Sequence, residues 1–231
     1  MSSYAFIFAR GGSKGLPRKN IKLLNNKPLI CYSIETAKAV EGIQHVFVST
    51  DDDEIATIAQ SAGALLIPRP AELATDTSAE WLSWRHAVCW VREQVGDFDT
   101  FISLPATSPL RAIEDVQAAI DKFAQSDADI CIAVTPASRN PYFNMVKTTV
   151  EGRVEVVCDS SGFDRRQDAP QVFDITTVVY VTTPEFIMSA DRVFAGKVVA
   201  IEVPKERAVD IDDHYDFLVA EALMKEAGHV A

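Results

Sequence analysis

The sequence predicts an α/β protein with a three-layer, mostly parallel open sheet. Between residues 4 and 134, short apolar runs of strand length alternate with longer segments whose apolar residues recur at helical spacing. Such alternation implies parallel strands joined by right-handed crossovers. A chain of 231 residues that is 48% hydrophobic and 24% charged is also long enough to bury a sizeable core.

The first five elements are interpreted as strand, helix, strand, helix and strand. The three strands are expected at residues 4–9, 45–50 and 65–67. Pro28 suits the start of the first helix, which ends before Gly42. Asp52 or Asp53 caps the second helix, and Gly63 ends it.

The next helix follows a polar loop at residues 69–76. Thr77 and Glu80 have the spacing of a capping box at its start. One face of the helix is apolar, and we interpret it as core or subunit contact rather than as a cofactor site; it comprises Trp81, Trp84, Val88, Val91 and Val95. Strands at 101–104 and 130–134 then enclose a helix marked by Ile113, Val116, Ile120 and Phe123.

The alternation breaks at Pro136. Residues 145–149 and 154–157, around Glu151 and Gly152, have the pattern of a hairpin, and a basic segment follows at 164–170. We therefore interpret about 136–172 as an arm outside the sheet. Strands resume at 176–181 and 198–203, and a final helix is expected to turn inward Tyr215, Leu218, Val219, Ala222 and Leu223. Residues 1–231 are taken as one domain that carries this arm.

Composition limits the partners of the chain. A net charge of -11 argues against general affinity for nucleic acid or a membrane surface. The sequence shows no stretch of membrane-spanning length and no signal-peptide pattern, so a cytoplasmic location is expected. Cys31, Cys89 and Cys131 lie among apolar neighbours, which suits buried thiols in a reducing compartment.

A basic, glycine-rich segment follows the first strand. Glycines at 11, 12 and 15 allow tight turns and a close approach to a ligand, and Gly11, Gly12 and Ser13 are candidates for backbone contacts to it. The cations of the segment, Arg10, Lys14 and Lys19, suit a phosphate chain. The spacing matches neither a Walker A loop nor a dinucleotide fingerprint. We name residues 9–20 the phosphate cradle.

Two acidic clusters are candidate metal sites. In an extended chain, Asp210 and Asp212 share one face while Ile211 points into the core, and two carboxylates on one face can bind Mg²⁺. Capping of the last helix is the alternative. The other cluster, Asp51–Asp53, follows a strand as in many sugar-nucleotide-dependent glycosyltransferases, but helix capping is the favoured interpretation there.

Taken together, these motifs resemble the CMP-sugar synthetases, in particular the acylneuraminate cytidylyltransferases. The likeness covers nearly the whole chain and rests on six blocks in the family's order: 9–20, 48–51, 69–74, 107–111, 166–170 and 210–212. The resemblance implies a Rossmann-like nucleotidyltransferase fold. It also implies transfer of CMP from CTP to a nonulosonic acid, with release of pyrophosphate.

The resemblance further implies roles for individual residues. Arg10, Lys14 and Lys19 would hold the triphosphate, and Asn20, Arg69, Thr77 and Ser78 would hold cytosine and ribose. Asp210 and Asp212 would hold Mg²⁺, with Asp210 as the candidate general base. The acid would lie near Thr107, Ser108, Thr176 and Thr177, and the arm would bring Arg165, Arg166 and Gln167 across a homodimer. Pro105 and Thr176–Thr177 depart from the family pattern, so the identity of the acid stays open.

Two other functions are compatible with the same sequence. A glycosyltransferase that uses Asp51–Asp53 would consume a sugar nucleotide instead of making one. A regulator that binds CTP without turnover would keep the cradle and lose catalysis.

Overall fold

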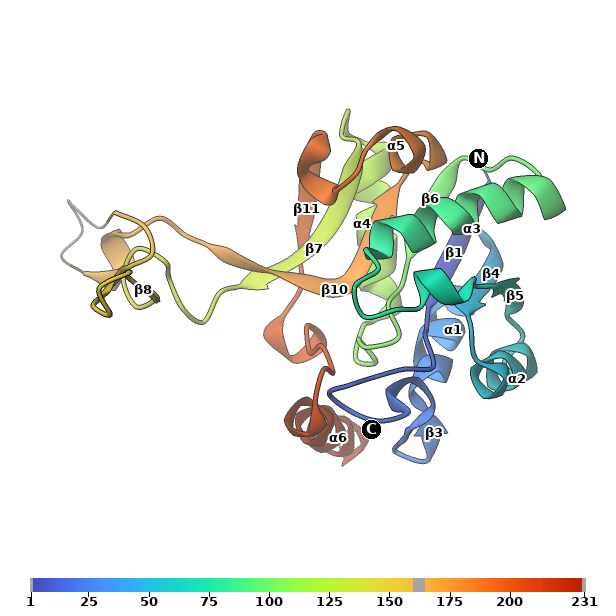
Figure 1. Cartoon of the computed structure of the whole chain (residues 1–231), viewed down its shortest axis with the longest axis horizontal. Helices are drawn as coiled ribbons and strands as arrows, with labels where there is room; N and C mark the ends of the chain where they lie inside the picture. Colours follow the sequence, from blue (N-terminus) through green and yellow to red (C-terminus); the bar gives the residue numbers. More distant parts are fainter. Residues whose placement is uncertain (1, 160–164, 230–231) are drawn as a thin grey trace.

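The computed structural model describes residues 2–159 and 165–229, apart from the side chains of Arg166 and residues 227–229. These residues form a seven-stranded sheet in the order β11-β7-β10-β6-β1-β4-β5 (Figure 1). Its strands are β1 (Ser3–Phe8), β4 (Ile43–Thr50), β5 (Leu65–Pro68), β6 (Thr100–Ser103), β7 (Ile130–Pro136), β10 (Phe173–Thr182) and β11 (Val198–Glu202). β10 is antiparallel to both of its neighbours and the other pairs are parallel. The predicted mostly parallel open sheet is confirmed.

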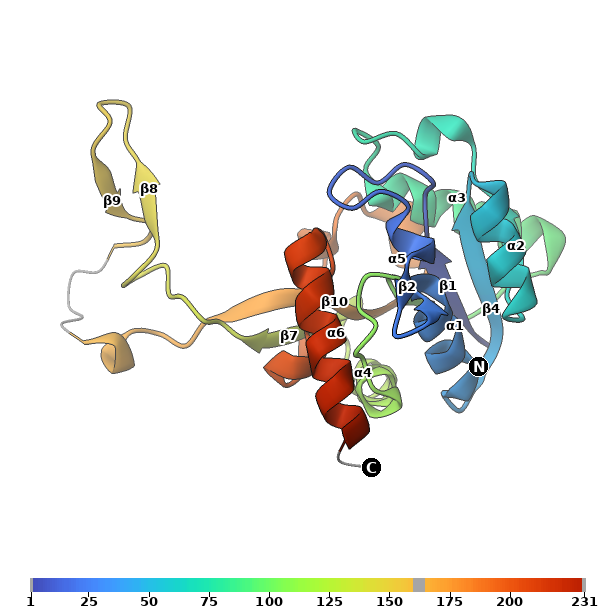
Figure 2. The same cartoon turned by 90° about the horizontal axis from the view of Figure 1, so that it is seen from below.

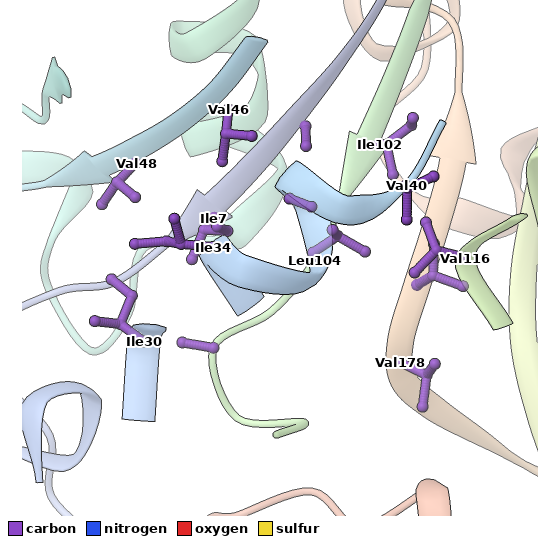
Figure 3. Close-up of a cluster of buried hydrophobic side chains, with 14 of the residues drawn as sticks. Ile7, Ile30, Ile34, Val40, Val46, Val48, Ile102, Leu104, Val116 and Val178 are labelled. Carbon is purple, nitrogen blue, oxygen red and sulfur yellow. The ribbon is translucent and has the colours of Figure 1, made fainter. Parts of the chain in front are cut away.

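Helices cover both faces of this sheet. The helices α1 (Leu29–Ala39), α2 (Asp53–Ser61) and α4 (Ile113–Ala124) pack on one face, and α3 (Glu80–Gln94) and α5 (Pro184–Ser189) pack on the other. Side chains alternate along each strand, so β1 sends Ala5 and Ile7 to the first face and Tyr4 and Phe6 to the second. Figure 3 shows the aliphatic cluster of the first face, where Ile34 of α1 lies against Ile7.

The strand order places a crevice beside β1. The chain winds from β1 through β4 to β5 on one side, and β6 then pairs with β1 on its other side. In open α/β sheets, ligands bind at such a reversal, outside the carboxyl ends of the strands. The phosphate cradle leaves β1 at this end, and the loop 104–111 leaves β6.

A third, smaller core fastens the C-terminal helix α6 (His214–His229) beside the cradle (Figure 2). It consists of Leu16, Leu24, Leu29, Ile211, Phe217 and Ala220. The predicted inward face of α6 is wrong: Tyr215 is 73% exposed and Leu218 is 49% exposed. The helix carries apolar residues on more than one face, and the face with Phe217 and Ala220 is the one that packs in this core. The ribbon before α1 forms a short antiparallel pair, β2 (Leu23–Leu24) and β3 (Lys27–Pro28).

The arm extends away from the sheet (Figures 1 and 2). It leaves at the end of β7 and returns at the start of β10, and the predicted hairpin is confirmed as β8 (Val146–Thr148) and β9 (Val154–Val156). The basic segment contains a single 3-10 turn at Arg166–Asp168, while Asp164 lies outside the described residues.

Three smaller expectations are wrong. Ala79, not Thr77, is the N-cap of α3, and no side-chain hydrogen bond caps that helix. Val95 is 44% exposed because it follows the last turn of α3. Cys89 is exposed on the outer side of α3, while Cys31 and Cys131 are buried as expected. Within the described ranges, no helix combines the length and apolar character needed to cross a bilayer.

Candidate active site

A cavity of about 290 Å³ lies in the crevice predicted by the strand order. Eight of the site residues expected from the sequence line it: Arg10, Gly12, Ser13, Lys19, Asn20, Arg69, Ser78 and Thr107. They come from the cradle, the end of β5, the loop before α3 and the loop after β6. Segments far apart in the sequence therefore converge on one cavity with three cationic side chains in its wall.

The glycines of the cradle have different tasks. The Gly11 amide donates to Asp51 Oδ1 at 3.0 Å, so this amide is engaged inside the protein. A Cβ at Gly15 would lie 2.3 Å from the carbonyl oxygen of Asp212, whereas one at Gly12 would meet nothing within 4 Å. Gly15 thus permits contact between the cradle and the C-terminal segment, and Gly12 leaves open space at the cavity.

Lys19 connects the cradle to the C-terminal acidic segment. Its ammonium donates to the Ile211 carbonyl at 2.6 Å and lies 3.2 Å from Asp212 Oδ1. The Lys19 side chain is only 12% exposed, whereas the Asp212 side chain is 77% exposed, so the ammonium is shielded and the carboxylate faces solvent. The predicted cationic and acidic segments therefore lie side by side, and Lys19 contributes charge to both.

The other two cations of the cradle share one carboxylate. Arg10 lies 2.7 Å from Asp76 Oδ1, and Lys14 lies 2.6 Å from Asp76 Oδ2. These pairs hold the loop before α3 across the mouth of the cradle. The Lys14 side chain is 80% exposed, so it is free of packing against the core.

Asn20 and Arg69 form the more deeply buried end of the cavity. The Asn20 amide donates to the Arg10 carbonyl at 3.0 Å and fixes the start of the cradle. Arg69 donates to the Ser49 hydroxyl and carbonyl at 3.1 and 2.7 Å and stacks over the Phe8 ring. Burial lowers the pKa of Arg69 to about 10, so it stays charged at neutral pH. Its planar guanidinium can recognise the carbonyl and ring nitrogen of a base.

Asp210 is partly buried behind Thr107 and Thr177. Burial raises the pKa of its carboxyl, as does the charge of Asp212, while the nearby hydroxyls of Thr107 and Thr177 and the charge of Lys19 lower that pKa. Its Oδ1 is buried without a hydrogen-bond partner in the described part of the chain. An unsatisfied buried carboxylate oxygen is costly unless a ligand or water completes it.

The cap of α6 is neither Asp210 nor Asp212. Asp213 Oδ1 accepts from the amides of Tyr215 and Asp216, and Asp216 Oδ2 accepts from the amides of Asp212 and Asp213. The capping interpretation of the 210–212 pair is therefore wrong, because the next aspartate takes that task. Neither carboxylate is used in capping: Asp210 keeps an unpartnered Oδ1, and Asp212 contacts Lys19 through its Oδ1.

The donor set fits Mg²⁺ shared with a substrate. Mg²⁺ in phosphate-transfer sites is held by one or two carboxylates together with phosphate oxygens and water. Asp210 offers an unpartnered oxygen, and the Asp212 side chain is 77% exposed. No cluster of three or more metal-ligating His, Cys, Asp or Glu side chains occurs in the described ranges, so a closed protein cage is not formed there.

Buried polar side chains attach the loop after β6 to neighbouring segments. Arg111 is 5% exposed and donates to the Ser33 hydroxyl at 2.7 Å and to the Thr177 carbonyl at 3.3 Å. Ser108 is fully buried, with its hydroxyl 2.6 Å from that of Thr177. Thr176 is 5% exposed and donates to the Ala133 carbonyl. Ser108 and Thr176 are thus enclosed by protein, which leaves Thr107 as the member of this group that lines the cavity.

The arm residues lie away from the cavity of their own chain. Arg165 forms a bidentate pair with Asp168, and Gln167 borders a separate hollow at the base of the arm. The side chain of Arg166 lies outside the described residues. Figure 2 shows the arm reaching outward from the sheet, with the 3-10 turn at 166–168 on its far part.

Asp51 and Asp52 are engaged in structural contacts. Asp52 Oδ1 accepts from the amides of Glu54 and Ile55 and caps α2, which confirms the favoured interpretation. Both Asp52 oxygens also pair with Arg18, and this hydrogen bonding holds the pKa of Asp52 below its usual range. Asp51 accepts from the Gly11 amide. The cluster therefore braces the cradle.

Six further residues line the cavity and were not among the candidates. They are Phe8, Leu73, Thr75, Asp76, Glu80 and Ser83. Asp76 is the one with ion pairs to the cradle. The polar composition of residues 69–76 marked a loop at the sheet edge, but nothing in the local sequence separates Asp76 from an ordinary solvated aspartate.

Comparison with known proteins identifies the family of the chain. Residues 4–183 match the sequence model of the cytidylyltransferase family. Post-translational flagellin modification protein B of Campylobacter coli is 38% identical over 95% of this chain and 94% of its own length. CMP-N,N'-diacetyllegionaminic acid synthase of Campylobacter jejuni is 36% identical over 94% of this chain and 93% of its own length.

Among solved structures, a CMP:2-keto-3-deoxy-manno-octonic acid synthetase complexed with CTP has a similar fold. Its TM-score is 0.72, and the match covers 98% of this chain and 100% of that one. At 17% identity, this likeness supports the fold alone.

Proposed function

Because the chain belongs to the cytidylyltransferase family, we propose that it transfers CMP from CTP to the anomeric hydroxyl of a nonulosonic acid. The hydroxyl oxygen attacks the α-phosphorus of CTP and forms the new P–O bond. The bond to the bridging oxygen of the β-phosphate breaks, pyrophosphate leaves, and the hydroxyl proton passes to a base. Among the relatives, the name of the 36% identical protein points to N,N'-diacetyllegionaminic acid as a first substrate to try.

The observation that carries the proposal is the convergence of the cradle, Arg69 and Asp210 at one crevice of the sheet. Lys19 lines the cavity and bonds to the segment that contains both aspartates. Phosphate transfer depends mainly on positioning and on neutralising charge. A cavity with cations on one side and an unpartnered carboxylate oxygen behind it supplies both requirements.

The residues that line the cavity and those near it have separate roles in this reaction. Arg10, Lys14 and Lys19 bind the phosphates and stabilise the leaving pyrophosphate. Asn20, Arg69 and the turn at Thr77–Ser78 bind cytosine and ribose. Asp210 is the candidate acceptor of the hydroxyl proton, and its raised pKa, caused by burial, suits a proton acceptor.

Asp210 and Asp212 are also the residues that would hold Mg²⁺. The ion supplies charge neutralisation at the phosphates when it is bound. The orphaned Asp210 Oδ1 and the exposed Asp212 carboxylate are the support for this assignment. Lys19, 3.2 Å from Asp212, keeps that carboxylate close to the cradle.

The test is turnover with a panel of acids. The protein is incubated with CTP, Mg²⁺ and, in turn, N,N'-diacetyllegionaminate, pseudaminate, N-acetylneuraminate, a deaminated analogue and an octulosonate. Pyrophosphate release with at least one acid is expected. Tight CTP binding without release on any acid would instead identify a regulator, and hydrolysis or transfer from a CMP-sugar would identify a glycosyltransferase.

We also propose that the catalytic unit is a homodimer in which the arm completes the partner's site. A hairpin outside the sheet has little core of its own, and β8 and β9 leave Val146 and Val154 at least 60% exposed. Arg165 and Arg166 suit the carboxylate of the acid. We would mix an inactive Lys14→Ala protein with an inactive Arg165→Ala/Arg166→Ala protein under subunit exchange. Partial recovery of activity is expected; a mixture that stays inactive, or a monomer by light scattering, would exclude the shared site.

A further inference from the structure

The carboxylate of Asp76 occupies the position between Arg10 and Lys14. Its two oxygens are divided between the cations, at 2.7 Å from the Arg10 guanidinium and 2.6 Å from the Lys14 ammonium. Asp76 also lines the cavity, as do its neighbours Thr75 and Ser78. The two cations therefore already hold an anion, and that anion belongs to the protein.

The geometry of this contact resembles that of a bound phosphate group. Two oxygens on one central atom bind two separate cations, which is how adjacent oxygens of a phosphate group would bind them. We propose that the Asp76 carboxylate occupies the binding position of one phosphate group and competes with the nucleotide for Arg10 and Lys14. The inference rests on the proposed function in one respect: that function identifies the competing ligand as a triphosphate or pyrophosphate.

The loop that carries Asp76 is lightly attached. It connects the 3-10 turn at Ala71–Leu73 with α3 and contains no regular structure of its own. Among residues 75–78, one backbone hydrogen bond is described, from the Ser78 amide to the Thr75 carbonyl at 3.3 Å. The Asp76 side chain is 40% exposed. Few bonds would therefore have to break for Asp76 to move away from Arg10 and Lys14.

Asp76 carries its charge at the pH of the cell, as an exposed carboxylate does. Hydrogen bonds from Lys14 and then Arg10 hold the pKa of Asp76 below its usual range. A charged carboxylate can neutralise the cations when no ligand is bound and can return when pyrophosphate leaves. Asp76 thereby lowers the affinity of the site for pyrophosphate, since each ligand must displace the carboxylate first.

The experiment measures binding of inorganic pyrophosphate to the full chain by calorimetry, without divalent cations. Two exposed ion pairs predict that Asp76→Asn binds pyrophosphate between about 2-fold and 30-fold more tightly than wild type. Glu72→Gln is the matched control, because Glu72 is exposed in the same region and forms none of the described ion pairs. It is expected to stay within about twofold of wild type, since distant exposed charges are screened by salt.

A second variant guards against an effect of the new amide group. Asp76→Ala must tighten binding in the same direction as Asp76→Asn, with an unchanged melting temperature. If neither variant binds pyrophosphate more tightly than Glu72→Gln, or if both bind it more weakly, Asp76 orders the two cations and does not compete. This readout is independent of turnover, so failure on the acid panel would reject the proposed function and leave the competition at Asp76 standing.

Discussion

Replacement of Gly15 by alanine tests whether the cradle and the acidic segment act as one unit. The new Cβ would lie 2.3 Å from the carbonyl oxygen of Asp212, and observed Cβ contacts essentially never fall below 3.0 Å. The obstacle is backbone, so it cannot move aside as a flexible side chain would. A gap of at least 0.7 Å must open between the two segments.

The gap has consequences that can be estimated. If the 2.6 Å bond from Lys19 to the Ile211 carbonyl lengthens by the same amount, it reaches about 3.3 Å, just beyond the usual range, and is weakened. A hydrogen bond to a charged group contributes about 1.5–3 kcal/mol, so the free energy of unfolding should fall by a part of that amount. Displacement of a catalytic group by about 1 Å can cost on the order of 100-fold in rate. Turnover should drop accordingly, and the Mg²⁺ concentration for half-maximal rate should rise.

Gly12→Ala is the matched control. Its Cβ would meet nothing within 4 Å, and neither glycine has a positive φ that an alanine would strain. We expect its unfolding free energy to stay within about 0.5 kcal/mol of wild type, with unchanged Mg²⁺ dependence. Urea unfolding and pyrophosphate release are measured on both variants. If Gly15→Ala matches Gly12→Ala in stability and metal dependence, the contact with Asp212 does not organise the site.

Three other substitutions separate the parts of the site. Lys14→Ala should keep the fold, since the side chain is 80% exposed, and lose about 10²–10³ in turnover; a loss below tenfold at saturating CTP would make Lys14 a surface charge only. Asp212→Asn should raise the Mg²⁺ requirement with little change in melting temperature, because Asp213 and not Asp212 caps α6; unchanged metal titration curves would contradict this. Asp52→Ala should lower stability at pH 7 by about 0.5–2 kcal/mol through loss of the cap. Because the folded pKa of Asp52 is depressed, its contribution is present above the unfolded value of about 3.9 and is lost as pH falls through the folded value, so the two unfolding curves should converge in acid.

The strands and helices of the sheet could be predicted because their signals are local. A buried parallel strand is a continuous apolar run, and such runs predict β4 and β7. A short polar residue before an apolar helical pattern predicts a cap at Asp52 or Asp53, and Asp52 is the N-cap of α2. These signals need no knowledge of what lies on the other side of the element.

The predictions that are wrong concern features that depend on packing against residues far away in the sequence. In α6, apolar residues at 215, 218, 219, 222 and 223 predict one inward face, but the helix packs Phe217 and Ala220 against Leu16, Leu24 and Leu29 instead. At α3, Thr77 has the right spacing for a cap, yet the helix begins one residue after Ala79. The sequence pattern permits both arrangements, and packing chooses between them.

The site shows the same division at a finer scale. Each half was recognisable alone, the cradle by its glycines and cations and the acidic segment by two carboxylates two residues apart. The contact between the two halves could not be recognised from the sequence, because it depends on the small core in which Leu16 of the cradle packs with Ile211, the residue between the two aspartates. That core explains why Ile211 is apolar between two acids and why Gly15 stands next to Leu16: one buries the acidic segment against the cradle, and the other lets their backbones touch. A shift of either segment therefore moves the phosphate-binding cations and the candidate metal ligands together, because apolar packing of Leu16 with Ile211 and the bonds of Lys19 to the acidic segment both fix the geometry between them.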